Sequence, residues 1–123
     1  MRKLFGLFIV MFFAFPAMAE PLTEQQKIDA LLDALSNSDI IFVHNGETMD
    51  SFAARQHLEN KLKETKGIET AEDFIVKVAS KSSHTGKPYL IREKVGGNET
   101  EAEKWFRDRL KELLLEDTTQ MID

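Results

Sequence analysis

The chain has 123 residues, with 16 basic and 21 acidic side chains and no cysteine. Its formal net charge of −5 argues against non-specific nucleic-acid binding and against an anionic membrane surface as a partner. Because no disulfide can form, an apolar core must stabilise any small folded domain.

Residues 1–19 have the pattern of a secretory signal peptide. Two basic residues at positions 2 and 3 precede an apolar run over residues 4–15, and Ala17 and Ala19 form a small-x-small cleavage pattern. The run is shorter than the roughly 20 apolar residues that a membrane span needs. We therefore expect cleavage between Ala19 and Glu20, a periplasmic location and no stable membrane anchor after cleavage. Residues 20–123 then suit one globular domain.

The first half of this domain predicts two helices around a hairpin. Thr23 and Gln26 make a capping box, and an apolar stripe predicts a helix over residues 21–37. Residues 40–43 are β-rich, and Asn45-Gly46 is a strong hairpin turn signal that predicts a return strand over residues 47–49. A second helix is expected over residues 52–65, capped by Asp50 or Ser51.

The second half predicts two more helices and at least one strand. Thr70 and Asp73 fit the cap of a third helix, which we expect to end near Ser80. Residues 89–94 predict a third strand, and a brief fourth strand remains open. The last helix is expected over residues 101–116, begun by a capping box of Thr100 and Glu103, with residues 118–123 frayed.

This order predicts an α+β fold, with a small antiparallel sheet (the hairpin plus one or two further strands) packed against about four helices. The predicted core residues are Ile28, Leu31, Leu35, Ile41, Val43, Leu58, Leu62, Phe74, Ile75, Val78, Tyr89, Ile91, Trp105, Phe106 and Leu110.

Several short motifs occur in a characteristic order: Phe42 before Asn45-Gly46, His57-Leu58 with Lys61, the run TAEDFI at 70–75, the run from Ala79 to Tyr89, and Trp105. Together they span nearly all of residues 21–114. This combination resembles an uncharacterised family of small exported bacterial proteins, known as a domain of unknown function. The resemblance implies a single exported domain and brings no activity, substrate or cofactor.

The polar loop of residues 82–87 is the first candidate site. Its hydroxyl, amide and ammonium groups, with an imidazole from the second helix, could bind an anion such as phosphate or carboxylate. The candidate binding residues are Ser82, Ser83, Thr85, Gly86, Lys87 and His57. A nucleotide-binding loop is rejected, because Lys81 stands where that motif has glycine and Pro88 where it has Ser or Thr. The alternative is a structural loop whose hydroxyls satisfy the end of the third helix.

Catalysis and metal binding are weaker hypotheses. Ser82 or Ser83 with His57 or His84 as base would make a small hydrolase or transferase, but the Gly-x-Ser-x-Gly elbow is absent. The three histidines, His44, His57 and His84, lack the paired spacing of a zinc site. We therefore expect no catalytic residue, metal or cofactor. The sequence favours a non-catalytic accessory protein that binds an unknown protein or a small anionic ligand.

Overall fold

The structure is a computed structural model that describes residues 20–122, with side chains described as far as Asp117. The predicted signal peptide, residues 1–19, lies outside the described residues.

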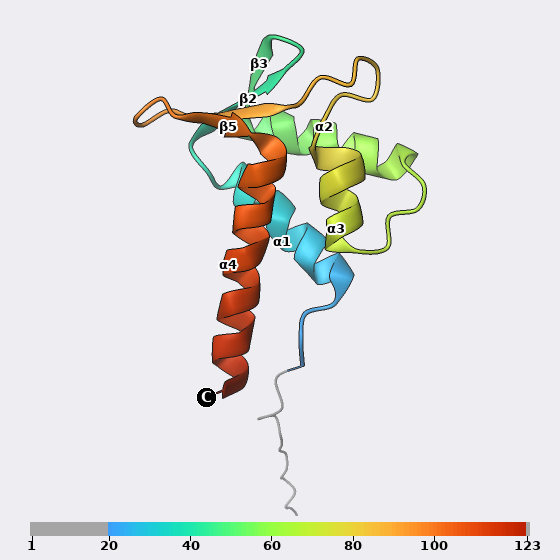
Figure 1. The fold of residues 1–123 in the computed structure, drawn as a ribbon, viewed down its shortest axis with the longest axis vertical. Helices are drawn as coiled ribbons and strands as arrows, with labels where there is room; N and C mark the ends of the chain where they lie inside the picture. Colours follow the sequence, from blue (N-terminus) through green and yellow to red (C-terminus); the bar gives the residue numbers. More distant parts are fainter. Residues whose placement is uncertain (1–19, 123) are drawn as a thin grey trace, which may run out of the picture.

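Within residues 20–122 the chain forms one antiparallel sheet of four strands, in the order β3-β2-β4-β5. The strands are β2 (Ile40–His44), β3 (Glu47–Asp50), β4 (Leu90–Glu93) and β5 (Glu99–Glu101). The helices are α1 (Glu24–Ser36), α2 (Ser51–Glu64), α3 (Ala71–Phe74) with its continuation η2 (Ile75–Ala79), and α4 (Ala102–Ile122). They lie together on one side of the sheet (Figure 1), so the predicted α+β fold is confirmed.

The hairpin and the first helix form as their local signals predict. Thr23 and Gln26 exchange both hydrogen bonds of a capping box at the start of α1. Asn45 and Gly46 both have positive φ angles, 53° and 83°, as a type I′ turn between β2 and β3 requires. In this turn His44 pairs with Glu47, which fixes the register of the hairpin.

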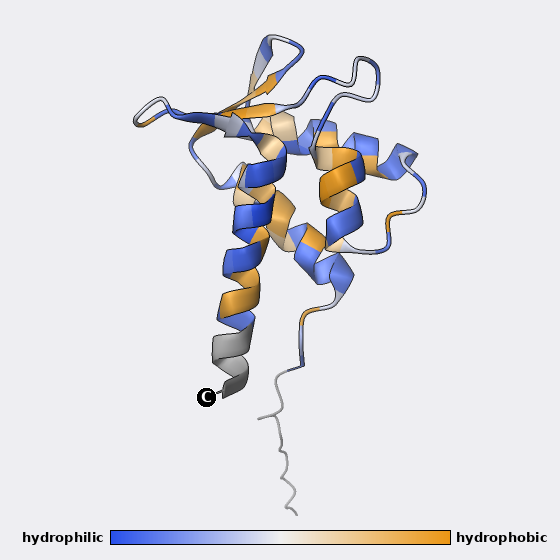
Figure 2. Cartoon of the chain, viewed as in Figure 1, coloured by the Kyte–Doolittle hydropathy of each residue, from blue (hydrophilic) through white to orange (hydrophobic). Residues whose placement is uncertain are grey.

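The apolar faces of the helices and the sheet enclose the core (Figure 2). The phase predicted for β2 is partly wrong, because Ile40 and Phe42 are buried while Ile41 is only half-buried. Four consecutive apolar residues carry no polar alternation that would fix which side of the strand faces inward. Leu62 and Leu110, also predicted in the core, are only partly buried and pack against its edge.

Two helix predictions need correction. The third helix is α-helical only over α3, and its last turn, η2, is a wider π-helix. At the end of η2 the Ser80 hydroxyl donates to the Val76 carbonyl at 2.6 Å. The fourth strand is present, and Thr100 pairs with Ile91 inside it, so Thr100 does not cap the last helix. That helix starts at Ala102 and continues to Ile122, past its predicted end at residue 116.

Candidate functional site

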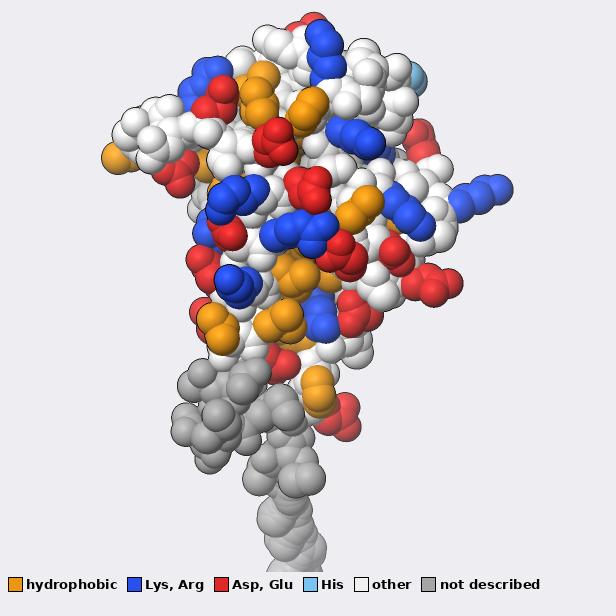
Figure 3. All heavy atoms as spheres, viewed as in Figure 1, with side chains coloured by type: hydrophobic (Ala, Val, Ile, Leu, Met, Phe, Trp, Pro, Cys, Tyr) orange, Lys and Arg blue, Asp and Glu red, His pale blue; other side chains and the backbone are white. Residues whose placement is uncertain are grey.

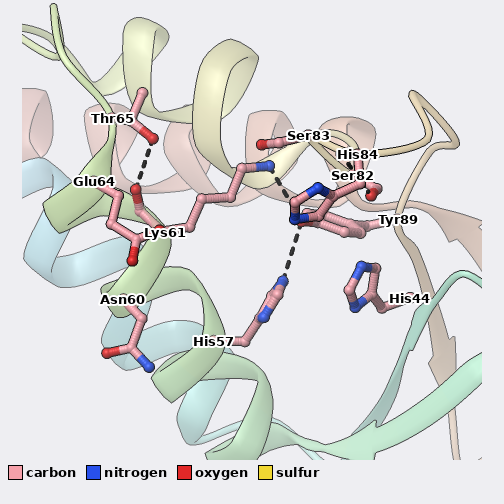
Figure 4. A pocket seen from close by; sticks show the side chains of 10 residues that line it. All are labelled: His44, His57, Asn60, Lys61, Glu64, Thr65, Ser82, Ser83, His84 and Tyr89. Atoms are coloured by element: carbon pink, nitrogen blue, oxygen red, sulfur yellow. Dashed lines mark hydrogen bonds between the residues drawn. The ribbon is translucent and has the colours of Figure 1, made fainter.

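A polar pocket of about 330 Å³ opens between α2, the end of β2 and the loop that follows η2 (Figure 4). Side chains from all three segments converge on it. Its lining residues are His44, His57, Asn60, Lys61, Glu64, Thr65, Ser82, Ser83, His84 and Tyr89.

The loop of residues 82–87 is closed by its own backbone. Ser82 N–H donates to the Lys87 carbonyl and Gly86 N–H donates to the Ser82 carbonyl, both at 2.9 Å. The Ser82 side chain is 2% exposed, and its hydroxyl oxygen accepts from the backbone amides of His84 at 3.2 Å and Thr85 at 3.4 Å. The buried hydroxyl therefore shapes the turn of its own loop, whereas the hydroxyl that bonds the end of the third helix is that of Ser80, outside the loop.

Asn45 fastens this loop to the hairpin. Lys87 N–H donates to the Thr85 hydroxyl oxygen at 3.2 Å, and the Thr85 hydroxyl donates to Asn45 Oδ1 at 2.7 Å. The Asn45 amide nitrogen then faces His44 Nε2 at 3.1 Å and Ser82 Oγ at 3.4 Å. In this orientation the amide nitrogen is the donor and His44 Nε2 is the acceptor.

Tyr89 lies where the walls of the pocket meet. Its side chain is 1% exposed, and its ring packs against Phe42 with centroids 5.0 Å apart. The hydroxyl oxygen lies 3.1 Å from Lys61 Nζ and 3.1 Å from His57 Nε2 (Figure 4). His44 stacks on His57 with ring centroids 4.7 Å apart, so two imidazoles, a phenol and an amine form one cluster.

Helix α2 presents two of these groups. The Asp50 side chain caps α2 by accepting from Ala53 N–H at 2.8 Å, and fully buried Leu58 packs the helix into the core. His57 and Lys61 are four residues apart, so they project from adjacent turns of one face. Lys61 Nζ also donates to the Lys81 carbonyl, which joins α2 to the loop.

Burial and like charge hold the cluster away from its charged forms. Burial, then the nearby His44 and Lys61, lower the pKa of His57. Burial, then Lys81, lower the pKa of Lys61, and burial raises the pKa of Tyr89. Among the described residues, no carboxylate forms an ion pair with Lys61. The pocket thus holds an ammonium group that makes no ion pair there, although the carboxylate of Glu64 also lines the pocket.

The structure brings half of the predicted binding residues to this pocket. His57, Ser82 and Ser83 line it, whereas the other three, Thr85, Gly86 and Lys87, are exposed on the loop and do not line it. Their part in binding stays a prediction. In the described part of the chain, no imidazole ring is hydrogen-bonded to a loop hydroxyl, which is the contact that a serine nucleophile and its base require.

The sequence did not single out Lys61 or Tyr89 as site residues. Tyr89 was assigned to the core, which is correct for its ring but leaves out its hydroxyl. A signal was present in the spacing of His57 and Lys61, because residues four apart lie on one face of a helix. Buried Leu58 follows His57 directly, so that face lies at the edge of the core. Tyr89, which contacts both side chains, is 32 residues from His57 and 28 residues from Lys61 in the sequence.

Metal ligands and membrane spans were sought over the same residues. No group of three or more His, Asp or Glu side chains in the described region is placed to hold a metal ion. No helix there combines the length and the apolar character needed to cross a membrane.

The fold and the pocket define a small α+β domain with a polar, imidazole-lined cavity, and comparison with known proteins places it in a family. Residues 22–114 match the model of a family of unknown function, DUF5329, and the chain belongs to that family. It is similar to the uncharacterised protein YfeK of Salmonella typhimurium, with 42% identity over 92 residues that cover 72% of this chain and 77% of the relative. No solved structure matches.

Proposed function

We propose that this chain is an exported, non-catalytic binding domain that takes a small anionic ligand in the pocket between α2, β2 and the loop of residues 82–87. The observation that carries the proposal is Lys61, a half-buried ammonium group that faces the pocket without a carboxylate partner in the described part of the chain. Burying a cation costs free energy unless an opposite charge accompanies it. An anionic ligand would supply that charge.

The rest of the lining suits a small anion. Lys61 Nζ has three N–H groups, of which two donate to Tyr89 and to the Lys81 carbonyl, so one remains for a ligand. Imidazoles and the exposed Ser83 hydroxyl offer further polar contacts at the same cavity. The volume of about 330 Å³ lies at the lower end of the range typical of small-molecule sites.

The test compares Lys61 with a matched lysine on the same helix. Lys63 is exposed, lies two residues further along α2 and does not line the pocket. Residues 20–123 would be titrated with sulfate while the backbone amide NMR signals of residues 57–65 and 81–89 are followed. We expect saturable shifts in the wild type and in Lys63→Gln, and an affinity at least about tenfold weaker in Lys61→Gln, a loss of roughly 1.4 kcal/mol.

Two controls keep the test decisive. Circular dichroism establishes that each variant is folded, and Lys61→Arg, which keeps the charge, is expected to retain binding. Equal affinity in Lys61→Gln and the wild type, or no saturable binding in the wild type, would overturn the proposal.

A further inference from the structure

The hydrogen bonds around Tyr89 leave little freedom in where the protons of the empty pocket lie. Lys61 is a donor to the Tyr89 oxygen, so the phenol proton is free to point elsewhere. Its second neighbour is His57 Nε2 at 3.1 Å, and Tyr89 is buried, so the phenol donates to that nitrogen. In this arrangement His57 Nε2 is the acceptor, which suits a neutral imidazole, and burial lowers the pKa of His57 in the same direction.

The neighbouring imidazole, His44, also faces a hydrogen-bond donor. Asn45 is oriented by Thr85, so its amide nitrogen donates to His44 Nε2. His44 and His57 stack with centroids 4.7 Å apart, and His57 shares a hydroxyl partner with the Lys61 ammonium group. Adding a proton to either ring would place a second positive charge close to Lys61, which is unfavourable without an anion beside it.

We propose that the pocket binds a dianionic head group, such as a sulfate, phosphate monoester or dicarboxylate, and that it takes up one proton on His57 as the dianion enters. Because it requires an anion in the pocket, this proposal rests on the proposed function. Lys61 balances one negative charge of the ligand, and protonated His57 balances the second. A monoanion is matched by Lys61 alone and takes up no proton.

Proton uptake at His57 also changes what Tyr89 offers. A proton on Nε2 turns that nitrogen into a donor, so the Tyr89 oxygen accepts from both Lys61 and His57. The phenol proton is then released to donate to the ligand. In the empty pocket the Tyr89 O–H is therefore bonded to His57. When a dianion binds and His57 takes up a proton, that O–H becomes free to donate to the ligand.

The groups that face His57 from every side are consistent with this linkage. Helix α2 contributes Lys61 and β2 contributes His44, while the loop contributes His84 and the Lys81 charge that acts on Lys61. Burial, then His44 and Lys61, oppose a proton on His57 in the empty pocket and lower its pKa. A negative ligand reverses the balance, so its binding raises the pKa of His57.

The carboxylate in the lining is the exposed Glu64, on the side of the pocket away from His44 (Figure 4). Its negative charge disfavours an anion at that end of the pocket, so the proposal places the ligand at the His57–Tyr89 end.

The experiment is isothermal titration calorimetry of residues 20–123 with sulfate and with methanesulfonate, in pairs of buffers that differ in ionisation enthalpy. Neither probe titrates between about pH 5 and 8, the range in which histidine changes charge, so any proton taken up belongs to the protein. We expect sulfate to take up close to one proton per ligand near neutral pH, with an affinity that rises about tenfold for each unit of falling pH until His57 is protonated in the free protein. Methanesulfonate should take up none.

Variants and a direct readout locate the proton. In His57→Gln, sulfate binding should be weaker and independent of pH, whereas in Lys63→Gln, which changes an exposed residue of the same helix outside the pocket, the pH dependence should remain. In the wild type, sulfate should move the His57 ring NMR signals to those of an imidazolium, a readout that needs no variant to fold.

The outcomes separate the two proposals. Saturable sulfate binding without proton uptake, or with uptake unchanged in His57→Gln, would overturn the dianion linkage and leave the anion site standing. Absence of sulfate binding at every pH would overturn both.

Discussion

Tyr89 is the residue at which three distant parts of the chain become one site. Its ring belongs to the core, and its backbone N–H donates to the Ser80 carbonyl at 3.0 Å, at the end of η2. Its hydroxyl is hydrogen-bonded to two polar side chains of α2, those of His57 and Lys61. A phenol can do both because an apolar body carries one polar tip. Removing that single oxygen therefore tests the polar role of Tyr89 without disturbing its packing.

We predict that Tyr89→Phe lowers the free energy of unfolding by about 1–3 kcal/mol, because Lys61 and His57 lose a buried partner while the ring contacts remain. The measurement is urea unfolding of residues 20–123, followed by fluorescence of Trp105, the single tryptophan, which is 5% exposed. The control is Thr48→Val, which removes an exposed hydroxyl on β3 and should change stability by no more than about 0.5 kcal/mol. Equal stability of Tyr89→Phe and the wild type would show that the hydroxyl network contributes nothing to the fold.

The same residues show how far the site could be predicted from the sequence. Ser82 was chosen because hydroxyls in a glycine-containing loop can bind anions, yet its own hydroxyl is occupied by the amides of His84 and Thr85. That competition between ligand and backbone is decided by loop geometry, which residue types do not specify. His57 does line the pocket, but its partner Tyr89 is 32 residues away.

At the scale of elements, boundaries set by local chemistry were predictable and those set by tertiary contacts were not. The start of α2 follows from Asp50, whose carboxylate caps the helix within four residues. The face of β2 and the wide turn of η2 depend instead on what packs against them. Ile41, in an unbroken apolar run, was placed on the wrong side for that reason.

We predict that Asp50→Ala destabilises the domain by about 1 kcal/mol, because the orphan amides in the first turn of α2 lose their acceptor. Asp50→Asn keeps a capping oxygen and should stay within a few tenths of a kcal/mol of the wild type. Urea unfolding of the three proteins under identical conditions gives both differences. Because α2 carries His57 and Lys61, Asp50→Ala should also make the backbone amides of its first turn exchange faster with deuterium. If the alanine and asparagine variants unfold at the same urea concentration, the cap is not what stabilises the start of this helix.

At the scale of the molecule, the surface charge around the pocket affects how an anion approaches it. Acidic and basic side chains alternate over the face shown in Figure 3, and Arg107 donates to both carboxylate oxygens of Glu72 at 2.8 and 2.7 Å to join α4 to α3. The net charge of the chain is negative, so the surface as a whole does not attract anions. Screening limits that repulsion to about 10 Å, and the Lys61 ammonium group can oppose it inside the pocket.

The last prediction concerns residues 1–19 and the compartment in which such a site meets its ligand. Expressed from Met1 in a bacterium with a Sec pathway, the chain should be recovered from the periplasmic fraction as a species that begins at Glu20, measured by intact mass. The physical basis is the basic start, an apolar run too short to span the bilayer, and small residues at positions 17 and 19 that fit the cleavage site. Ala19→Leu places a bulky side chain at the cleavage position and should leave an uncleaved precursor in the membrane fraction. A charge in the apolar run, Ile9→Arg, should keep the chain in the cytoplasm. Full-length protein in the cytoplasm for the wild type would contradict export, and the ligand would then have to be sought among cytoplasmic anions.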